Sequence, residues 1–153
     1  MASDKLQDII TRTGAQIIQD RKSTILTVGP DKVNETCQLM LAELPGLYHL
    51  STITGVDGGT TISLFYHFWQ GKEFLSVKTG VPKDNPVIPS LTNILPAALL
   101  YEAEVKDILG VEFKGNPLMG RRLLLPDSYP PEAPPPLRKE ADPEKIRKMM
   151  ELE

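Results

Sequence analysis

Several residue types that carry chemistry are scarce in this sequence. Among its 153 residues it has one cysteine, Cys37, and two histidines, His49 and His67. A single cysteine excludes an intrachain disulfide framework and any metal or cluster site built from cysteines alone. Glycine-rich phosphate loops, nucleophile elbows and metal-binding helix motifs are also missing. The sequence therefore presents no ready-made catalytic or cofactor site.

Long apolar runs and an excess of positive charge are missing as well. The longest apolar candidate, residues 95–101, is far shorter than the ~20 residues that span a bilayer. The formal net charge of −3 argues against a nucleic-acid partner held by a general basic field. The first residues, MASDKLQDII, carry acids and lack an apolar signal core. We therefore expect a protein of the cytosol, or of the cytosolic side of a larger assembly.

Proline, by contrast, is abundant and unevenly placed. Seven of the 14 prolines fall in residues 126–143. Because proline fixes φ and removes a hydrogen-bond donor, this stretch should be extended and without a core of its own. Asp142 and Pro143 then form an N-cap and first helical position for a short terminal helix. We expect a folded domain over residues 1–125 and a proline-rich arm with a terminal helix over 126–153.

The first 125 residues have the pattern of an α+β domain. Helical spacing of apolar residues predicts helices over residues 31–44 and 97–109, the second approached through a helix entry at Pro89–Ser90. Alternating residues over 47–79 predict an antiparallel meander, with a two-residue hairpin turn at Gly58–Gly59. We expect a two-layer sandwich of an antiparallel or mixed sheet with helices, ferredoxin-like or related. Asp57 before the two glycines is typical of turn chemistry.

The strand expected over residues 61–69 has large side chains on both faces. One face takes Ile62, Leu64, Tyr66 and Phe68, and the other takes Thr61, Ser63, Phe65, His67 and Trp69. The expected hairpin register adds Tyr48 and Leu50 to the second face and puts His49 and His67 on opposite faces. Either helices of this chain or another protein should cover so apolar a surface. For both histidines we expect a hydrogen-bonded structural role.

The most unusual stretch is EAEVKDILGVEFKGNPLMGRRLLLP, residues 102–126. Three acids, Glu102, Glu104 and Asp107, interrupt every apolar stripe of the predicted helix. No clean polar face can therefore be drawn. An unpaired charge in apolar surroundings is costly, and Arg121 and Arg122 return after one turn with guanidinium groups suited to carboxylates. We expect acid–arginine pairs that lock a helix–turn unit. The alternative is a solvated helix with incidental charges.

These residues resemble the C-subunit family of respiratory complex I, which is the small peripheral-arm component of NADH–quinone oxidoreductase. Homologues of this family occur in membrane-bound nickel–iron hydrogenases and in related ferredoxin-linked archaeal complexes. The resemblance covers about residues 45–140 and includes Pro89–Ser90 upstream. Its motif residues are Glu102, Glu104, Asp107, Gly110, Pro117, Arg121, Arg122, Pro136, Leu137, Arg138 and Lys139.

Three positions depart from the family pattern. Ala103 stands where quinone-linked members usually have arginine, Asn116 replaces the usual histidine before proline, and Lys106 replaces a residue that is often tyrosine. The Glu102-Ala103-Glu104 version is more similar to subunits of the hydrogenase-type or archaeal ferredoxin-linked branch. The C-subunit of NADH–quinone oxidoreductase proper is the alternative within the family.

The resemblance implies a non-catalytic structural or assembly subunit in the hydrophilic arm of a membrane-bound, ion-translocating oxidoreductase complex. Such a subunit docks on the large catalytic subunit beside an iron–sulfur subunit, at the cytoplasmic side, and meets the membrane only through the complex. It binds no cofactor, because the iron–sulfur clusters and any nickel–iron or quinone site belong to the partners. The motif residues would then act as a structural clamp and interface, with the arm lying along the large subunit.

Two functions of other classes stay open. A free-standing regulatory module of ferredoxin-like fold would bind a small ligand and keep the arm as a free tail. A self-contained enzyme would use the acids of residues 102–107 as an acid–base pair. Neighbouring arginines should keep those acids ionised, which removes the proton donor that such an enzyme needs.

Overall fold

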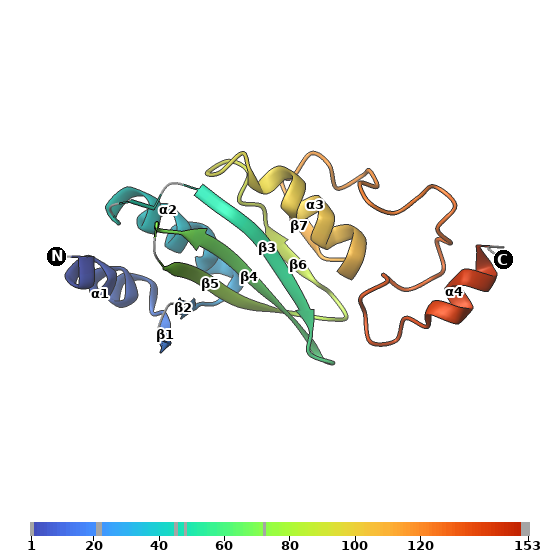
Figure 1. Cartoon of the computed structure of the whole chain (residues 1–153), viewed down its shortest axis with the longest axis horizontal. Helices are drawn as coiled ribbons and strands as arrows, with labels where there is room; N and C mark the ends of the chain where they lie inside the picture. Colours follow the sequence, from blue (N-terminus) through green and yellow to red (C-terminus); the bar gives the residue numbers. More distant parts are fainter. Residues whose placement is uncertain (1, 21–22, 45, 48, 72, 151–153) are drawn as a thin grey trace.

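A mixed five-stranded sheet forms the framework of the protein (Figure 1). The computed structural model describes residues 2–20, 23–44, 46–47, 49–71 and 73–150. The strands lie in the order β1-β2-β5-β4-β3, with β2 and β5 parallel and the other pairs antiparallel. Their bounds are β1 Gln16–Asp20, β2 Ser23–Thr27, β3 His49–Asp57, β4 Thr61–Trp69 and β5 Phe74–Pro82.

Two helices pack on the same face of this sheet, which is the face that carries the core. They are α2, Val33–Glu43, which follows a 3-10 turn at Pro30–Lys32, and α3, Ala98–Leu109. A Cβ added to Gly55 of β3 would lie 2.3 Å from Leu109 of α3, so the absence of a side chain lets α3 approach the strand. Helix α1, Ala2–Thr13, packs against α2.

The apolar face of β4 confirms the expected alternation. Its residues Ile62, Leu64, Tyr66 and Phe68 are fully buried. Burial, with Cys37 of α2 and Glu102 of α3 nearby, raises the pKa of Tyr66 well above its ordinary value. The α+β class with a two-layer, mixed sheet is thus confirmed. The predictions for Tyr48 lie outside the described residues.

A β-bulge in β3 changes which residues share a face. The register shifts between Leu50 and Thr52, so that Leu50 lies opposite Phe68 and His49 lies opposite Trp69. One extra residue reverses the alternation beyond it. Leu50 is consequently buried in the core, and His49 lies on the same face as His67. The predictions that Leu50 joins the second face and that the histidines lie on opposite faces are wrong.

The second face of the sheet has no cover among the described helices (Figure 1). Phe65, His67 and Trp69 are half-buried there. His67 Nδ1 is 2.8 Å from Ser76 Oγ, which confirms a hydrogen-bonded role for this histidine. Desolvation lowers the pKa of His67. We expected either helices of this chain or another protein to cover this face, and the described helices of this chain do not cover it.

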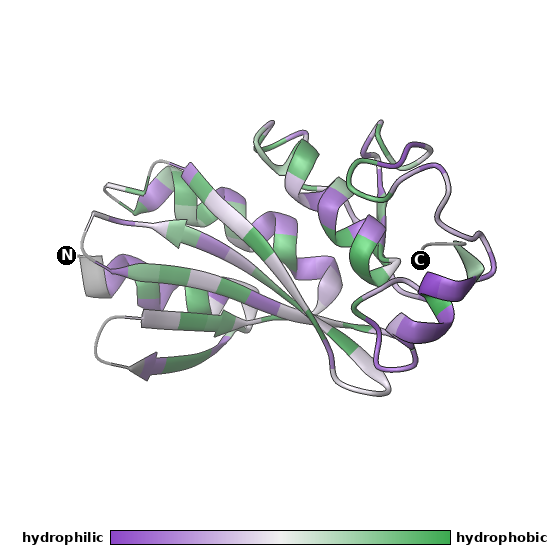
Figure 2. Cartoon of the chain, turned by 45° about the vertical axis from the view of Figure 1, so that its right-hand side comes forward, coloured by the Kyte–Doolittle hydropathy of each residue, from purple (hydrophilic) through white to green (hydrophobic). Residues whose placement is uncertain are grey.

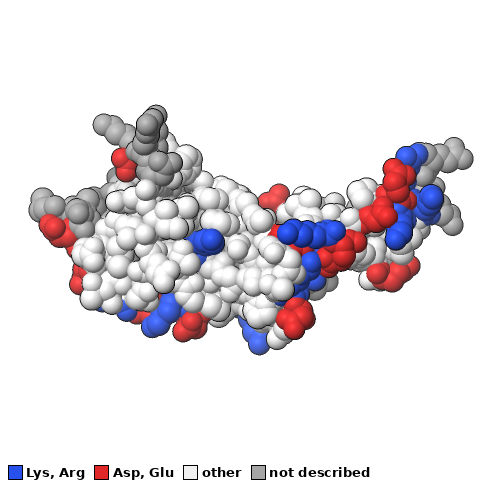
Figure 3. All heavy atoms as spheres, turned by 90° about the horizontal axis from the view of Figure 1, so that it is seen from below, with Lys and Arg blue, Asp and Glu red and all other residues white. Residues whose placement is uncertain are grey.

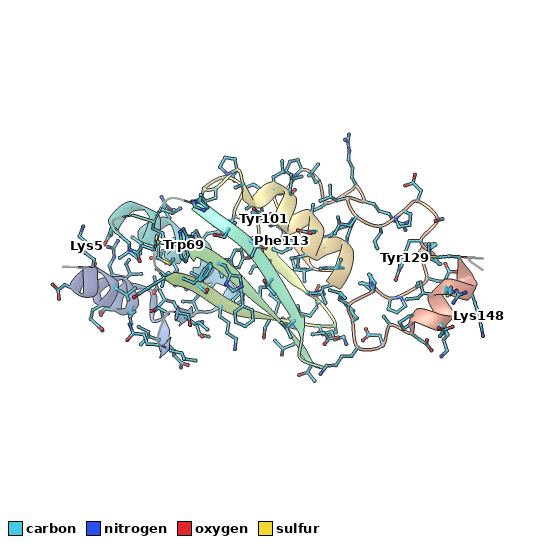
Figure 4. All side chains as sticks on the ribbon, in the orientation of Figure 1. Lys5, Trp69, Tyr101, Phe113, Tyr129 and Lys148 are labelled. Carbon is cyan, nitrogen blue, oxygen red and sulfur yellow. The ribbon has the colours of Figure 1, made fainter. Side chains whose placement is uncertain are left out.

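Helix α3 connects two short strands that pair with each other. Strand β6, Val87–Pro89, lies parallel to β7, Glu112–Lys114, and Gly110 ends α3 in the left-handed conformation with φ of 72°. Phe113 of β7 lies beneath α3 (Figure 4) and is fully buried. Ser90 does not open a helix as expected, since α3 begins eight residues later and the Ser90 side chain instead binds Glu102.

The arm runs along the end of the molecule away from α1 (Figure 1). Residues 115–142 form turns and bends, and α4, Pro143–Met149, follows with the Asp142 side chain accepting hydrogen bonds from the first-turn N–H groups. The short terminal helix is thus confirmed, whereas the domain division at residue 126 stays a prediction. None of the described helices has the length and apolar character needed to cross a bilayer.

Candidate protein-docking site

Glu102 is the most deeply buried charged group of the motif. Its carboxylate accepts hydrogen bonds from the Ser90 hydroxyl at 2.6 Å, the Leu91 N–H at 2.6 Å and the Asn116 side-chain amide at 2.9 Å. Burial raises the pKa of Glu102, and the three hydrogen bonds only partly oppose this effect. Neutral donors, and not an arginine, therefore satisfy this carboxylate.

These contacts join three parts of the motif that are separate in sequence. Asn116 also donates to the Leu99 carbonyl at 3.0 Å and accepts from the Leu118 N–H at 2.8 Å. The turn that contains the exposed Pro117 is thereby fixed against α3. Glu102 is a structural tie between α3, the segment after β6 and the turn after β7.

Asp107 holds the segment that follows the two arginines. Its side chain is 1% exposed, and Oδ2 accepts from three consecutive N–H groups, those of Leu123 at 2.6 Å, Leu124 at 2.7 Å and Leu125 at 3.3 Å. Lys106 Nζ lies 3.1 Å from the other oxygen. Burial acts to raise the pKa of Asp107, but these hydrogen bonds outweigh it and lower the pKa. Residues 123–125 thus wrap an anionic carboxylate with backbone amides.

The two arginines do not pair with the acids, so the expected acid–arginine pairs are wrong. Arg122 Nη1 donates to the carbonyls of Pro126 at 2.8 Å, Asp127 at 3.2 Å and Tyr129 at 2.9 Å. The Arg121 side chain is exposed, while its carbonyl accepts from Lys106 at 2.8 Å. The arm has neither helix nor strand over these residues, so its backbone carbonyls need other hydrogen-bond donors, and Arg122 donates to three of them. Figure 2 shows that hydrophilic and hydrophobic residues are mixed along α3, which is the pattern that led to the predicted pairing.

Glu104 differs from the other two acids. It is half-buried on α3 and makes no hydrogen bond or ion pair within the part of the chain that the structure describes. Of the three acids, Glu102 and Asp107 are internal ties, whereas Glu104 stays available on the helix surface.

The end of the arm folds back onto the last turn of α3. The Leu137 N–H donates to the Ile108 carbonyl at 2.9 Å, and Arg138 Nε donates to the Leu109 carbonyl at 2.7 Å. A Cβ on Gly110 would lie 2.9 Å from Pro135 Cγ, and the positive φ also favours glycine. The Pro136–Lys139 motif therefore caps α3, with Pro136 half-buried beside it.

Asp57 fastens the arm to the hairpin, a role that the sequence did not reveal. Its carboxylate accepts from the Gly59 N–H at 2.8 Å, as turn chemistry predicts, and also from Lys83 Nζ at 2.6 Å and the Lys139 N–H at 2.9 Å. Lys83, and then the N–H groups of Lys139 and Gly59, lower the pKa of Asp57. Lys83 also binds Glu140. No local pattern links Asp57 to an amide 82 residues away.

The outer surface of this region is apolar. Four leucines lie exposed on α3 and along the arm, namely Leu100, Leu123, Leu124 and Leu137. Tyr129 is instead buried within the arm (Figure 4), where its hydroxyl donates to the Pro134 carbonyl at 2.6 Å. Within the described residues, no group of three His, Cys, Asp or Glu side chains could hold a metal ion. The arrangement suits protein contact better than acid–base chemistry, since hydrogen bonds already occupy Glu102 and Asp107.

Comparison with known proteins identifies relatives of this chain. The chain is 29% identical to the C-subunit of NADH-quinone oxidoreductase from Salinispora tropica over 121 residues, which is 74% of this chain and 49% of that protein. It is 42% identical to the membrane-bound hydrogenase subunit beta of Pyrococcus furiosus over 69 residues, 45% of this chain and 39% of that one. The matches thus span half or less of these two relatives.

A solved structure is similar over nearly the whole chain. It is a chain of the membrane-bound sulfane sulfur reductase, an archaeal respiratory membrane complex, with a TM-score of 0.81 and 26% identity over 98% of this chain and 91% of that one. The family model of the respiratory-chain NADH dehydrogenase 30 Kd subunit matches residues 26–147, which include every motif residue and most of the sheet. The chain therefore belongs to the family of the respiratory-chain NADH dehydrogenase 30 Kd subunit.

Proposed function

We propose that this protein is a structural subunit in the hydrophilic arm of a membrane-bound, ion-translocating oxidoreductase complex, where it docks on the large catalytic subunit. The observation that carries the proposal is that the motif divides into buried residues and exposed residues. The carboxylates of Glu102 and Asp107 are buried and accept hydrogen bonds from within the chain. The exposed parts of the same region include four leucines and Arg121, and apolar side chains and arginine are common in protein interfaces.

The surroundings of the two buried acids support a non-catalytic role. A general acid or base needs access to a reacting atom, whereas Glu102 is fully buried and Asp107 is closed by three amides. In the proposed complex the iron–sulfur clusters, and any nickel–iron or quinone site, belong to the large catalytic subunit and the neighbouring iron–sulfur subunit. This chain would lie at the cytoplasmic side and meet the membrane only through them.

Within the family we favour the hydrogenase-type or ferredoxin-linked branch. The three positions that depart from the family pattern have defined surroundings in the structure. Asn116 binds Glu102, Lys106 binds both Asp107 and the Arg121 carbonyl, and Ala103 is buried, where an arginine would not fit without rearrangement. The relatives named for a hydrogenase and a sulfane sulfur reductase are consistent with this choice. The C-subunit of NADH–quinone oxidoreductase is the second candidate.

Purification of the tagged full-length chain from native membranes in mild detergent tests the proposal. We expect it to bring down a large catalytic subunit and an iron–sulfur subunit in equal amounts, and the identity of the large subunit decides between the two branches. Recovery of the chain alone, as a monomer with a bound metabolite, would instead support a free-standing regulatory module.

A further inference from the structure

We propose that Leu123 and Leu124 form a pre-built contact that inserts into an apolar pocket with an acidic rim on the partner subunit. We call residues 121–125 the leucine loop. The inference rests on the proposed function and adds to it the contact residues and the chemistry of the surface that receives them.

The first support is the way in which Asp107 organises the loop. Three consecutive N–H groups converge on one carboxylate oxygen, which fixes the backbone of residues 123–125. The side chains of Leu123 and Leu124 are nevertheless 44% and 52% exposed. A buried carboxylate is thus used to hold two leucines in water, where they contribute little to the folded chain. Fixing a loop in its bound shape before binding lowers the entropy lost on association.

The second support is a brace on each side of the leucine loop. Lys106 ties the Arg121 carbonyl to α3, and Arg122 gathers three carbonyls of the arm that follows. Between loop and arm lies a small hollow of about 140 Å³, lined by Lys106, Arg122, Leu125 and Tyr129 among others. Leu125 faces this hollow and is only half-exposed, so the loop sends one leucine inward and two outward.

The charge around the leucine loop indicates the partner's chemistry. Residues 114–125 contain Lys114, Arg121 and Arg122 and no acid. Arg122 is engaged with carbonyls, whereas Arg121 and Lys114 are exposed. Figure 3, which views the molecule from below, shows acidic and basic residues intermixed toward the arm and α4, so the sign of the charge beside the loop is taken from its own residues. Leu123 and Leu124 follow Arg121 closely in the chain, and two exposed leucines beside an exposed guanidinium group fit an apolar pocket with carboxylates on its rim.

The test uses the tagged full-length chain in place of the native copy, with recovery of the large catalytic subunit as the readout. We expect the double variant Leu123→Ser with Leu124→Ser to recover about tenfold less of that subunit than the unaltered chain, because the two leucines would no longer remove their apolar surface from water on binding. The control is Ile17→Ser, which removes a side chain that is 42% exposed on β1 and lies on the other side of the sheet from Phe65, His67 and Trp69. The control should recover the subunit fully, and both variants should keep the thermal unfolding midpoint.

A photo-crosslinking residue at position 124 gives an independent readout. It should join the large subunit at a peptide that contains apolar residues with Asp or Glu beside them, whereas the same group at position 17 of β1, at the other end of the molecule, should not. Full recovery by the double variant, or a crosslink from position 124 to a basic or wholly polar peptide, would overturn the inference. Absence of the large subunit even with the unaltered chain would instead overturn the proposed function.

Asp107 should act as a positioning residue for this contact. In Asp107→Asn both leucines remain, yet the amides of residues 123–125 lose their anionic acceptor. We expect a smaller loss of recovery, about threefold, together with faster hydrogen exchange of the leucine loop in the free chain. Faster exchange with unchanged recovery would show that the pre-built shape is not needed.

Discussion

Replacing Asp107 by asparagine should loosen the leucine loop without removing a contact surface. Asparagine has nearly the same size, and its oxygen can still accept from Leu123 and Leu124. It carries no charge, however, and its amide nitrogen would face Lys106. The change therefore isolates the contribution of the anionic acceptor.

The magnitude follows from the two short bonds. A hydrogen bond to a charged group contributes roughly twice as much as a neutral one, about 2 against about 1 kcal/mol. The bonds from Leu123 and Leu124, at 2.6 and 2.7 Å, should each lose about 1 kcal/mol. A total of about 2 kcal/mol corresponds to an opening equilibrium that is about 30-fold larger.

Hydrogen exchange followed by mass spectrometry measures this opening directly. At pH 7 the peptide that contains residues 123–125 should exchange about 30-fold faster in Asp107→Asn than in the unaltered chain. Glu104→Gln is the matched control, because Glu104 lies on the same helix and makes no hydrogen bond or ion pair within the described residues. In this variant the peptide that contains residues 123–125 should exchange at the rate of the unaltered chain.

The effect of Asp107→Asn on hydrogen exchange should depend on pH in a definite direction. Folding lowers the pKa of Asp107 below its ordinary value of 3.8, so the folded state favours the ionised form. The stabilisation is present above that value and is lost as the pH falls through the lower folded pKa. The difference between variant and unaltered chain should accordingly shrink in acid. An exchange rate that does not change at pH 7, or a difference that persists undiminished in acid, would refute the reasoning.

Three further predictions concern the ties around α3. Gly110→Ala should lower the free energy of unfolding by about 1–2 kcal/mol through left-handed strain and contact with Pro135, whereas Gly120→Ala, which adds a Cβ in open space, should not; thermal unfolding compares them. An NMR titration of the Glu102 carboxyl carbon should give a midpoint above 4.5, and unfolding free energy should fall as the pH rises through that interval, because the folded state holds the proton more tightly; a midpoint at or below 4.5 would contradict the burial argument. Asp57→Asn should speed trypsin cleavage after Arg138 and Lys139 relative to the control Asp84→Asn, and equal cleavage would mean that the arm is held elsewhere.

Much of the fold is accessible from local patterns. The apolar spacing of α3, the alternation of β4 and the N-cap at Asp142 each depend on neighbouring residues, and all three are present in the structure. The predicted face of Leu50 was wrong because a single bulge residue reverses the alternation of side chains along β3. Bulges leave no reliable local pattern in the sequence.

The candidate site was found from the sequence, but the partners of its charges were not. The expectation that Glu102 and Asp107 are buried and satisfied is correct in kind, since an unsatisfied buried carboxylate is too costly. Arginine appeared the natural partner because of its charge. The structure uses backbone amides, a hydroxyl and a side-chain amide instead, and it uses Arg122 to collect carbonyls of an irregular chain.

The family, the α+β class and the position of a charged helix followed by an arm could all be inferred without the structure, because motif spacing and periodicity are properties of neighbouring residues. The partner of each charged group, by contrast, depends on the three-dimensional fold. Asp57 meets the Lys139 amide across 82 residues, and Asp107 meets amides that no side-chain pattern marks. Backbone donors are the same at every residue, so which of them a carboxylate binds depends on how the chain folds back in space.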